Sequence, residues 1–473
     1  MNALLDRLFA LVRAHACILC IGIGMGIYRC AHEWPVWFGE TYLLAQGGSL
    51  PFNFDVFLFV DIGKVAGVIA YVAACYRLDK AGRNGFLLVV PSAVLLAGYA
   101  LSLPCLFSNG IFVPLVLFCL VACGIGAGML FAQWIEVCGR LSPLNMIEAL
   151  AISYLLRFLL LPIVTDLTPY LSALLIMVVA GSSFIQVAFC QRLLPFPLDS
   201  KEECPRTLPD RHARTGYGIL FAWVCVYAFT FGLGEASTQL AHHVTVSGTG
   251  YVIPSLLVVV LAFKFGDRFD RNFLYAISIP LMAAGLMGLE FFGVNAALAQ
   301  TFVSAGMCAF ELLVYTTACI YAYRSRTSAM FAASCVRVIA LVAADAAVLL
   351  VRFAPGINIA LLIVFAMMAT VAMGFAMFLP QVTERLEQRQ LSTPYPGDNR
   401  METLRQAASN VGLSPRETTV FLLLADNKSA NQISSELFIS NGAVRSHCSR
   451  IYDKFGVHSR KELDALLEKI RAR

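Results

Sequence analysis

The chain has 473 residues, of which 59% are hydrophobic and only 14% are charged, and its mean hydropathy is +0.73. Its formal net charge is +5. This composition excludes a chain built only of ordinary soluble domains and indicates a polytopic membrane protein.

Twelve apolar runs are long enough to cross a bilayer as helices, which takes about 20 residues each. Arg7 and Arg13 precede the first run, as in a signal peptide, but no convincing cleavage site follows, so we expect a retained span. The predicted spans are residues 14–32, 56–76, 85–105, 111–135, 145–165, 170–190, 216–236, 247–265, 272–293, 297–322, 330–351 and 357–379.

Basic residues concentrate in every second loop, while Arg29 and Arg352 lie at span edges. The positive-inside rule therefore predicts a multi-pass membrane protein with both termini cytoplasmic. The basic loop at residues 194–215 separates two predicted six-helix halves, residues 1–193 and 216–380. The basic loop residues are Arg77, Lys80, Arg83, Arg140, Arg192, Lys201, Arg206, Arg211, Arg214, Lys264, Arg268, Arg271, Arg324 and Arg326.

Two similar loops support an internal repeat. Residues 79–83 (Asp-Lys-Ala-Gly-Arg) follow the second span, and residues 267–271 (Asp-Arg-Phe-Asp-Arg) follow the eighth. Both resemble the D-R-x-G-R loop of the major facilitator superfamily, although Asp270 stands where glycine is usual. The resemblance implies two related six-helix halves, latched on the cytoplasmic side by charge contacts of these loops.

Charged residues inside the spans are candidates for ligand binding, because each costs a few kcal/mol unless it is paired or faces a cavity. Arg157 and Arg337 lie in pseudo-equivalent spans and suit a small anionic or aromatic ligand. The alternative is structural: Asp61 pairs with Lys64 within one helical turn, and the other charges lock helix ends. The candidate ligand-binding residues are Arg157, Arg337, Glu136, Glu311, Asp345, Trp134 and Tyr315.

Two glycine runs, residues 22–26 and 124–128, lie in apolar spans and predict close helix packing through G-x-x-x-G rather than a nucleotide site. The 15 cysteines are scattered through apolar stretches, where cysteine behaves as a small hydrophobic residue. Cys17 and Cys20 have no second pair to complete a ligand set. We expect no metal and no cofactor.

Residues 381–409 form a predicted linker. Residues 384–390 can extend the last span as a helix, whereas residues 392–398 contain two prolines and a glycine that favour an irregular tether. Such a tether lets the last segment, residues 410–473, move relative to the membrane.

The last segment predicts four short helices. Ser414, Ser429 and Ser459 each precede a Glu or Gln by three residues, which is the spacing of a capping box. Pro415 suits a first helical position, and Gly456 is placed to end the third helix. That helix, residues 440–455, has one apolar stripe for packing and an opposite face of small and polar residues that suits the major groove.

These residues resemble the LuxR-type helix-turn-helix domain: Gly412 to Glu417, residues 431–434 and 437–440, Ala443 to His447, and Tyr452 to Val457 with Ser459 and Arg460. Ala443 and Arg445 stand where the family usually has Thr and Lys. The resemblance implies that double-stranded DNA is bound by a homodimer. It places Arg445, Ser446 and Ser449 at bases, Lys454 and Arg460 at phosphates, and Leu463, Leu466 and Ile470 at the dimer contact, with Lys428 as a further DNA-binding residue.

Lysine and arginine exceed the acidic residues by only three from Val411 to the C-terminus, so charge alone does not establish DNA binding. A small structural bundle and a cytoplasmic interaction module stay as alternatives. We expect a membrane-bound one-component transcriptional regulator, not an enzyme, whose membrane domain senses an unidentified small molecule. The other hypothesis is an active transporter with an autoregulatory DNA-binding domain.

Overall fold

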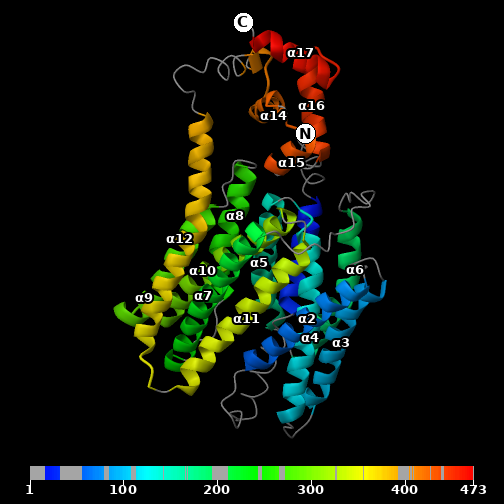
Figure 1. Ribbon diagram of the computed structural model, residues 1–473. Helices are drawn as coiled ribbons and strands as arrows, with labels where there is room; N and C mark the ends of the chain where they lie inside the picture. Colours follow the sequence, from blue (N-terminus) through cyan, green and yellow to red (C-terminus); the bar gives the residue numbers. More distant parts are fainter. Residues whose placement is uncertain are drawn as a thin grey trace, which may run out of the picture. The chain divides into compact units, whose positions relative to one another are not determined.

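The protein is described by a computed structural model (Figure 1) that consists of two compact units, residues 1–377 and 378–473. The division falls inside helix α12, and each unit is considered separately below. The described residues are 16–31, 56–78, 85–107, 113–141, 143–165, 167, 169–193, 211–242, 248–265, 272–324, 327–354, 356–392, 404, 407, 408, 410–426, 428–437 and 441–471.

The first unit is a bundle of helices whose bounds agree closely with the predicted spans. The largest differences are at α7, which begins five residues earlier and ends six residues later, and at α12, which continues through the predicted helical extension to Ser392. The helices are Ala16–Ala31, α2 (Val56–Leu78), α3 (Gly85–Phe107), α4 (Val113–Cys138), α5 (Pro143–Thr165), α6 (Pro169–Leu193), α7 (Arg211–His242), η1 (Gly248–Tyr251), α8 (Val252–Phe265), α9 (Asn272–Phe292), α10 (Ala296–Arg324), α11 (Ala329–Phe353) and α12 (Ile359–Ser392).

Nine of the described helices are long and apolar enough to cross a membrane. Three shorter apolar helices accompany them, at residues 16–31, 86–102 and 249–262. The apolar part of α10 is entirely buried inside the bundle, whereas only 28% of the apolar parts of α6 and α12 is buried, as expected of helices that face lipid. The unit is therefore a multi-pass membrane domain.

Glycines bring α2 and α4 into backbone contact. A Cβ atom at Gly67 would lie 2.0 Å from the carbonyl oxygen of Ile125, and one at Gly128 would lie 2.1 Å from that of Lys64. Gly63 and Gly124 make the same kind of approach, so only glycine fits at these four positions. The close packing predicted for residues 124–128 is confirmed.

The other glycine run packs the first described helix against α5 and α4. Cβ atoms at Gly22 and Gly26 would clash with α5, and one at Gly24 would clash with the indole of Trp134. In the later part of the unit, Gly232 of α7 meets the backbone of α11 at Ala344 in the same way. Close helix packing through small residues thus recurs along the unit.

The second unit contains the four predicted helices, α14 (Pro415–Ala425), α15 (Ala430–Leu437), α16 (Asn441–Phe455) and α17 (Arg460–Arg471). Their common core includes Val420, Phe421, Ile433, Val444 and Ile451. The predicted apolar stripe of α16 is confirmed, because Cys448 and Phe455 pack against the same core.

The predicted helix boundaries have the expected causes. Ser414 and Glu417 form a full capping box at the start of α14, with Pro415 in the first turn, and Ser429 and Gln432 form one before α15. At Ser459 the hydroxyl accepts the N–H of Glu462, but the Glu462 carboxylate accepts the N–H of His458 instead. Gly456 ends α16 with φ +67°.

Some sequence predictions fall outside the described residues. They include the two loops that resemble the major facilitator superfamily, residues 79–83 and 267–271, most of the basic loop, residues 194–210, the breaker-rich segment from residue 393, and Ser440, the first residue of the predicted third helix of the last segment.

Candidate functional site

The exposed face of α16 carries the side chains expected to face bases. Arg445, Ser446 and Ser449 are exposed, whereas Val444 and Ile451 on the opposite side are buried in the core. The domain thus presents a polar helix face from a rigid apolar base, which is the arrangement that a major-groove recognition helix requires.

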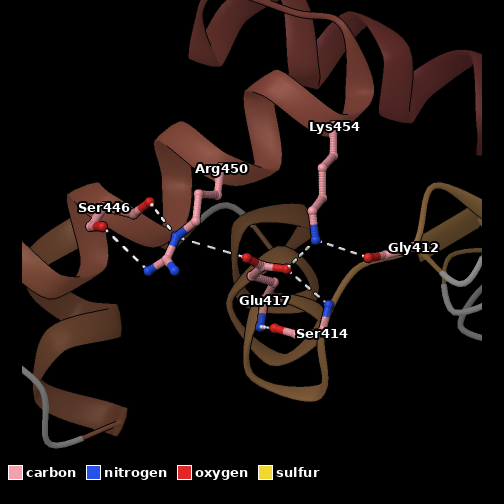
Figure 2. Close-up of polar contacts among 6 residues, drawn as sticks. All are labelled: Gly412, Ser414, Glu417, Ser446, Arg450 and Lys454. Carbon is pink, nitrogen blue, oxygen red and sulfur yellow. Dashed lines mark hydrogen bonds and ion pairs between the residues drawn. The ribbon is translucent and has the colours of Figure 1, made fainter. Parts of the chain in front are cut away.

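A buried carboxylate links α14 to α16. The Glu417 side chain is only 4% exposed and accepts hydrogen bonds from Lys454 Nζ at 2.8 Å and from the backbone N–H of Ser414 at 2.8 Å (Figure 2). Arg450 Nε lies 3.8 Å from the other carboxylate oxygen. Glu417 therefore fixes the start of α14 and the orientation of α16 together.

Lys454 and Arg460 are held within the domain rather than extended from it. Lys454 Nζ also donates to the carbonyl oxygen of Gly412 at 2.9 Å, so two of its three N–H donors are used internally. Arg460 pairs with Asp464 at 3.0 Å and donates to the carbonyl oxygen of Leu424. Phosphate contact by either residue stays a prediction.

The apolar residues of α17 were predicted to form the dimer contact, but the first of them packs inside its own domain. Leu463 is fully buried in the core of its own domain, and Leu466 packs partly against that core. Leu463 therefore contributes to the core of its own domain, and a dimer contact by Leu463, Leu466 and Ile470 stays a prediction. The side chain of Ile470 is outside the described residues, and Lys428 is half-buried before α15.

The hydrogen bonds to Lys454 and to the Ser414 N–H lower the pKa of Glu417 to about 2. Because the pKa is lowered on folding, this stability is present above pH 4.5 and is lost as the pH falls toward 2. We expect Glu417→Gln to destabilise the domain by about 1–2 kcal/mol at pH 7. Hydrogen exchange of residues 415–455 in the full-length protein measures this, with the exposed Asp453→Asn as control. Equal protection in both variants would contradict the role of Glu417.

Four charged groups in the membrane unit form two pairs between residues three or four positions apart. Lys64 and Asp61 of α2 are 2.7 Å apart, as the structural alternative predicts. Glu136 pairs with Arg140 at 2.5 Å at the end of α4. Glu136 therefore serves a helix end, and ligand contact by it is not supported by this geometry.

A further pair joins α10 to α11. Arg337 Nη1 donates to Glu311 Oε1 at 3.2 Å, and its guanidinium lies 5.6 Å from the ring centre of Phe131. Tyr315 is buried beside the same ring, with ring centres 5.5 Å apart. Trp134 is also fully buried, and Asp345 is half-buried on α11.

Arg157 lies in a different cluster, which contains a residue that the sequence analysis did not single out for binding. Arg29 donates to Ser153 Oγ at 2.9 Å and lies 3.7 Å over the ring of Tyr154. Tyr154 stacks on Tyr251 of η1 at 5.0 Å, and Arg157 lies 5.1 Å over Tyr251. Both arginines are 8% exposed. In the sequence, Arg29 is marked only as a charged residue in the last turn of an apolar span, which could have indicated a binding residue.

The C-terminal unit matches known DNA-binding proteins. Residues 411–466 match the family described as bacterial regulatory proteins, luxR family. The spore germination protein GerE of Bacillus subtilis (strain 168) is 44% identical over 59 residues, which are 12% of this chain and 77% of GerE. The resemblance of the sequence to a LuxR-type domain is confirmed.

The membrane unit matches solved transporters in fold. The human organic anion transporter MFSD10 (TETRAN) is 14% identical with a TM-score of 0.53, covering 76% of this chain and 98% of that one. The major facilitator superfamily transporter FucP is 14% identical with a TM-score of 0.51, covering 76% and 97%. The chain therefore belongs to the luxR family of bacterial regulatory proteins and carries its DNA-binding domain after a membrane unit of the major facilitator fold.

Proposed function

We propose that this protein is a membrane-bound one-component transcriptional regulator. The observation that carries the proposal is the presence, on one chain, of a luxR-type DNA-binding domain and a multi-pass unit of the major facilitator fold. In this proposal the membrane unit binds a small molecule, and its occupied state changes how two tethered domains bind DNA as a dimer. Signalling occurs by ligand binding rather than by catalysis.

The proposal includes twelve membrane crossings in two six-helix halves, with both termini in the cytoplasm. The helix packing supports the two halves, because contacts recur with an offset of six helices: α3 with α4 and α9 with α10, and likewise α2 with α4 and η1 with α10. In this proposal the C-terminal domain lies on the side of the chromosome, as an even number of crossings and the positive-inside rule predict.

We assign ligand binding to the cluster of Arg29, Tyr154, Arg157 and Tyr251 as well as to Arg337. In this cluster the two arginines lie over the rings of Tyr154 and Tyr251, and Arg29 donates to the hydroxyl of Ser153. Buried guanidinium groups beside aromatic rings suit a small anionic or aromatic ligand. The cluster joins α5 to η1, which belong to different proposed halves, so a ligand there can favour one arrangement of the halves. To move the membrane unit almost completely from one state to the other, the ligand must bind the favoured state about 5.5 kcal/mol more tightly.

We expect the full-length protein in membranes to enrich genomic fragments that contain two inverted half-sites about one DNA turn, or roughly 10 base pairs, apart. Footprinting measures the spacing, and Arg445→Ala should lower affinity by about 1–3 kcal/mol. A single asymmetric half-site occupied by one copy would contradict the dimer. Release of the C-terminal domain by protease added outside intact cells would contradict the topology.

The other candidate function is an active transporter that also regulates its own expression. The fold favours it, since both solved proteins named above are transporters. Reconstituted liposomes without DNA discriminate between the two functions. Saturable accumulation of the inducing molecule would favour transport, whereas saturable binding without accumulation supports the sensor.

A further inference from the structure

Arg450 is an exposed residue of α16 that the family resemblance did not assign to DNA. Its side chain is 55% exposed, yet it lies in a defined place. The Nη2 atom donates to Ser446 Oγ at 3.3 Å, and Nε donates to the Ser446 carbonyl oxygen at 3.3 Å. Figure 2 shows the guanidinium between Ser446 on one side and Glu417 on the other.

This contact decides which hydrogen-bonding group Ser446 can offer. The Ser446 oxygen accepts an N–H from Arg450, so its own hydroxyl hydrogen is left to donate outward. In the described part of the chain, the contacts of Arg450 use Nε and Nη2, which leaves the two N–H groups of Nη1 for a ligand. The pair therefore presents two adjacent donors and one positive charge.

Among the base edges of the major groove, guanine alone presents two adjacent acceptors, N7 and O6. Adenine pairs its N7 acceptor with an amino donor, cytosine presents an amino donor, and thymine pairs O4 with a methyl group. A pair of donors therefore fits guanine better than any other base.

We propose that Ser446 and Arg450 form one composite reader of a guanine in each half-site, separate from the base read by Arg445. The inference rests on the proposed function, because it requires α16 to enter the major groove. Glu417 is the positioning residue, since one of its carboxylate oxygens lies 3.8 Å from Nε of Arg450. The alternative is a phosphate contact by Arg450, which carries no sequence information.

The experiment uses the full-length protein in lipid nanodiscs and a random-sequence DNA pool. Wild-type protein should select half-sites with at least two fixed guanines. Replacing each guanine by a deazaguanine without N7 should lower affinity at least about fivefold, as loss of a bidentate base contact requires. Arg445→Ala should abolish the sensitivity at one guanine, and Arg450→Ala should abolish it at the other.

Matched variants separate the roles of the two side chains. Ser446→Ala should remove the sensitivity at the Arg450 guanine, and Glu417→Gln should weaken that sensitivity more than the sensitivity at the Arg445 guanine. Asp453→Asn, a change at an exposed position of the same helix, should leave both sensitivities intact.

If the Arg450→Ala variant stays sensitive to deazaguanine at every position, the proposed composite reader is wrong. A loss of affinity that is equal for all sequences, with a slope of log affinity against log salt concentration that is smaller by about one, would identify a phosphate contact instead. Failure of the wild-type protein to select any sequence would overturn the proposed function itself.

Discussion

Arg337→Ala is expected to destabilise the membrane unit by about 3–5 kcal/mol, because it leaves the Glu311 carboxylate buried without its cation. The Glu311 side chain is 8% exposed and belongs to α10, the most enclosed helix of the bundle. Thermal unfolding in detergent, followed by tryptophan fluorescence, measures the loss. Arg352→Ala serves as the control, because it removes a charge from the last turn of α11, where the loss of the charge costs little stability.

The double variant Arg337→Met with Glu311→Met separates the charge effect from packing. Replacement of a whole buried pair by apolar side chains is often neutral, so the double variant should recover most of the lost stability. If the single variant is as stable as wild type, the pair is not a structural contact. Loss of ligand response in Arg337→Ala alone would therefore report misfolding as readily as loss of a ligand contact.

Gly67→Ala is expected to destabilise the same unit by about 2–3 kcal/mol, because the added methyl group meets the backbone of α4. The carbonyl oxygen of Ile125 lies 2.0 Å from the position of the new Cβ, so the two helices have to separate. In an exposed helix the same change stabilises by up to about 1 kcal/mol. The sign of the effect thus tests the contact.

Gly218→Ala is the matched control, since a Cβ at this exposed position of α7 has nothing within 4 Å among the described residues. It should be neutral or stabilising in the same unfolding experiment. Equal melting temperatures for Gly67→Ala and wild type would show that α2 and α4 are not in backbone contact.

The sequence predicted the features that depend on neighbours within a helical turn. The Asp61–Lys64 pair, two of the three capping boxes and the apolar stripe of α16 all follow from spacings of three or four residues, and each is present. Such contacts form within one element, so their geometry is fixed before any tertiary packing.

The sequence could not identify partners far apart in the chain. Lys454 was assigned to phosphate, yet it binds Glu417, which lies 37 positions earlier. Leu463 was assigned to a dimer, yet its apolar face is covered by its own domain. A spacing indicates that a polar side chain needs a hydrogen-bond acceptor or that an apolar side chain needs to be buried. Only the packed structure shows which groups meet these needs.

The interlocked glycines of α2 and α4 also restrict how the membrane unit can change shape. The carbonyl oxygens of Val60, Lys64, Val121 and Ile125 each occupy a notch that only a missing side chain provides. Axial sliding of one helix past the other would press these oxygens against residues that carry a Cβ. Any rearrangement between alternative states must therefore carry the two helices together as one body.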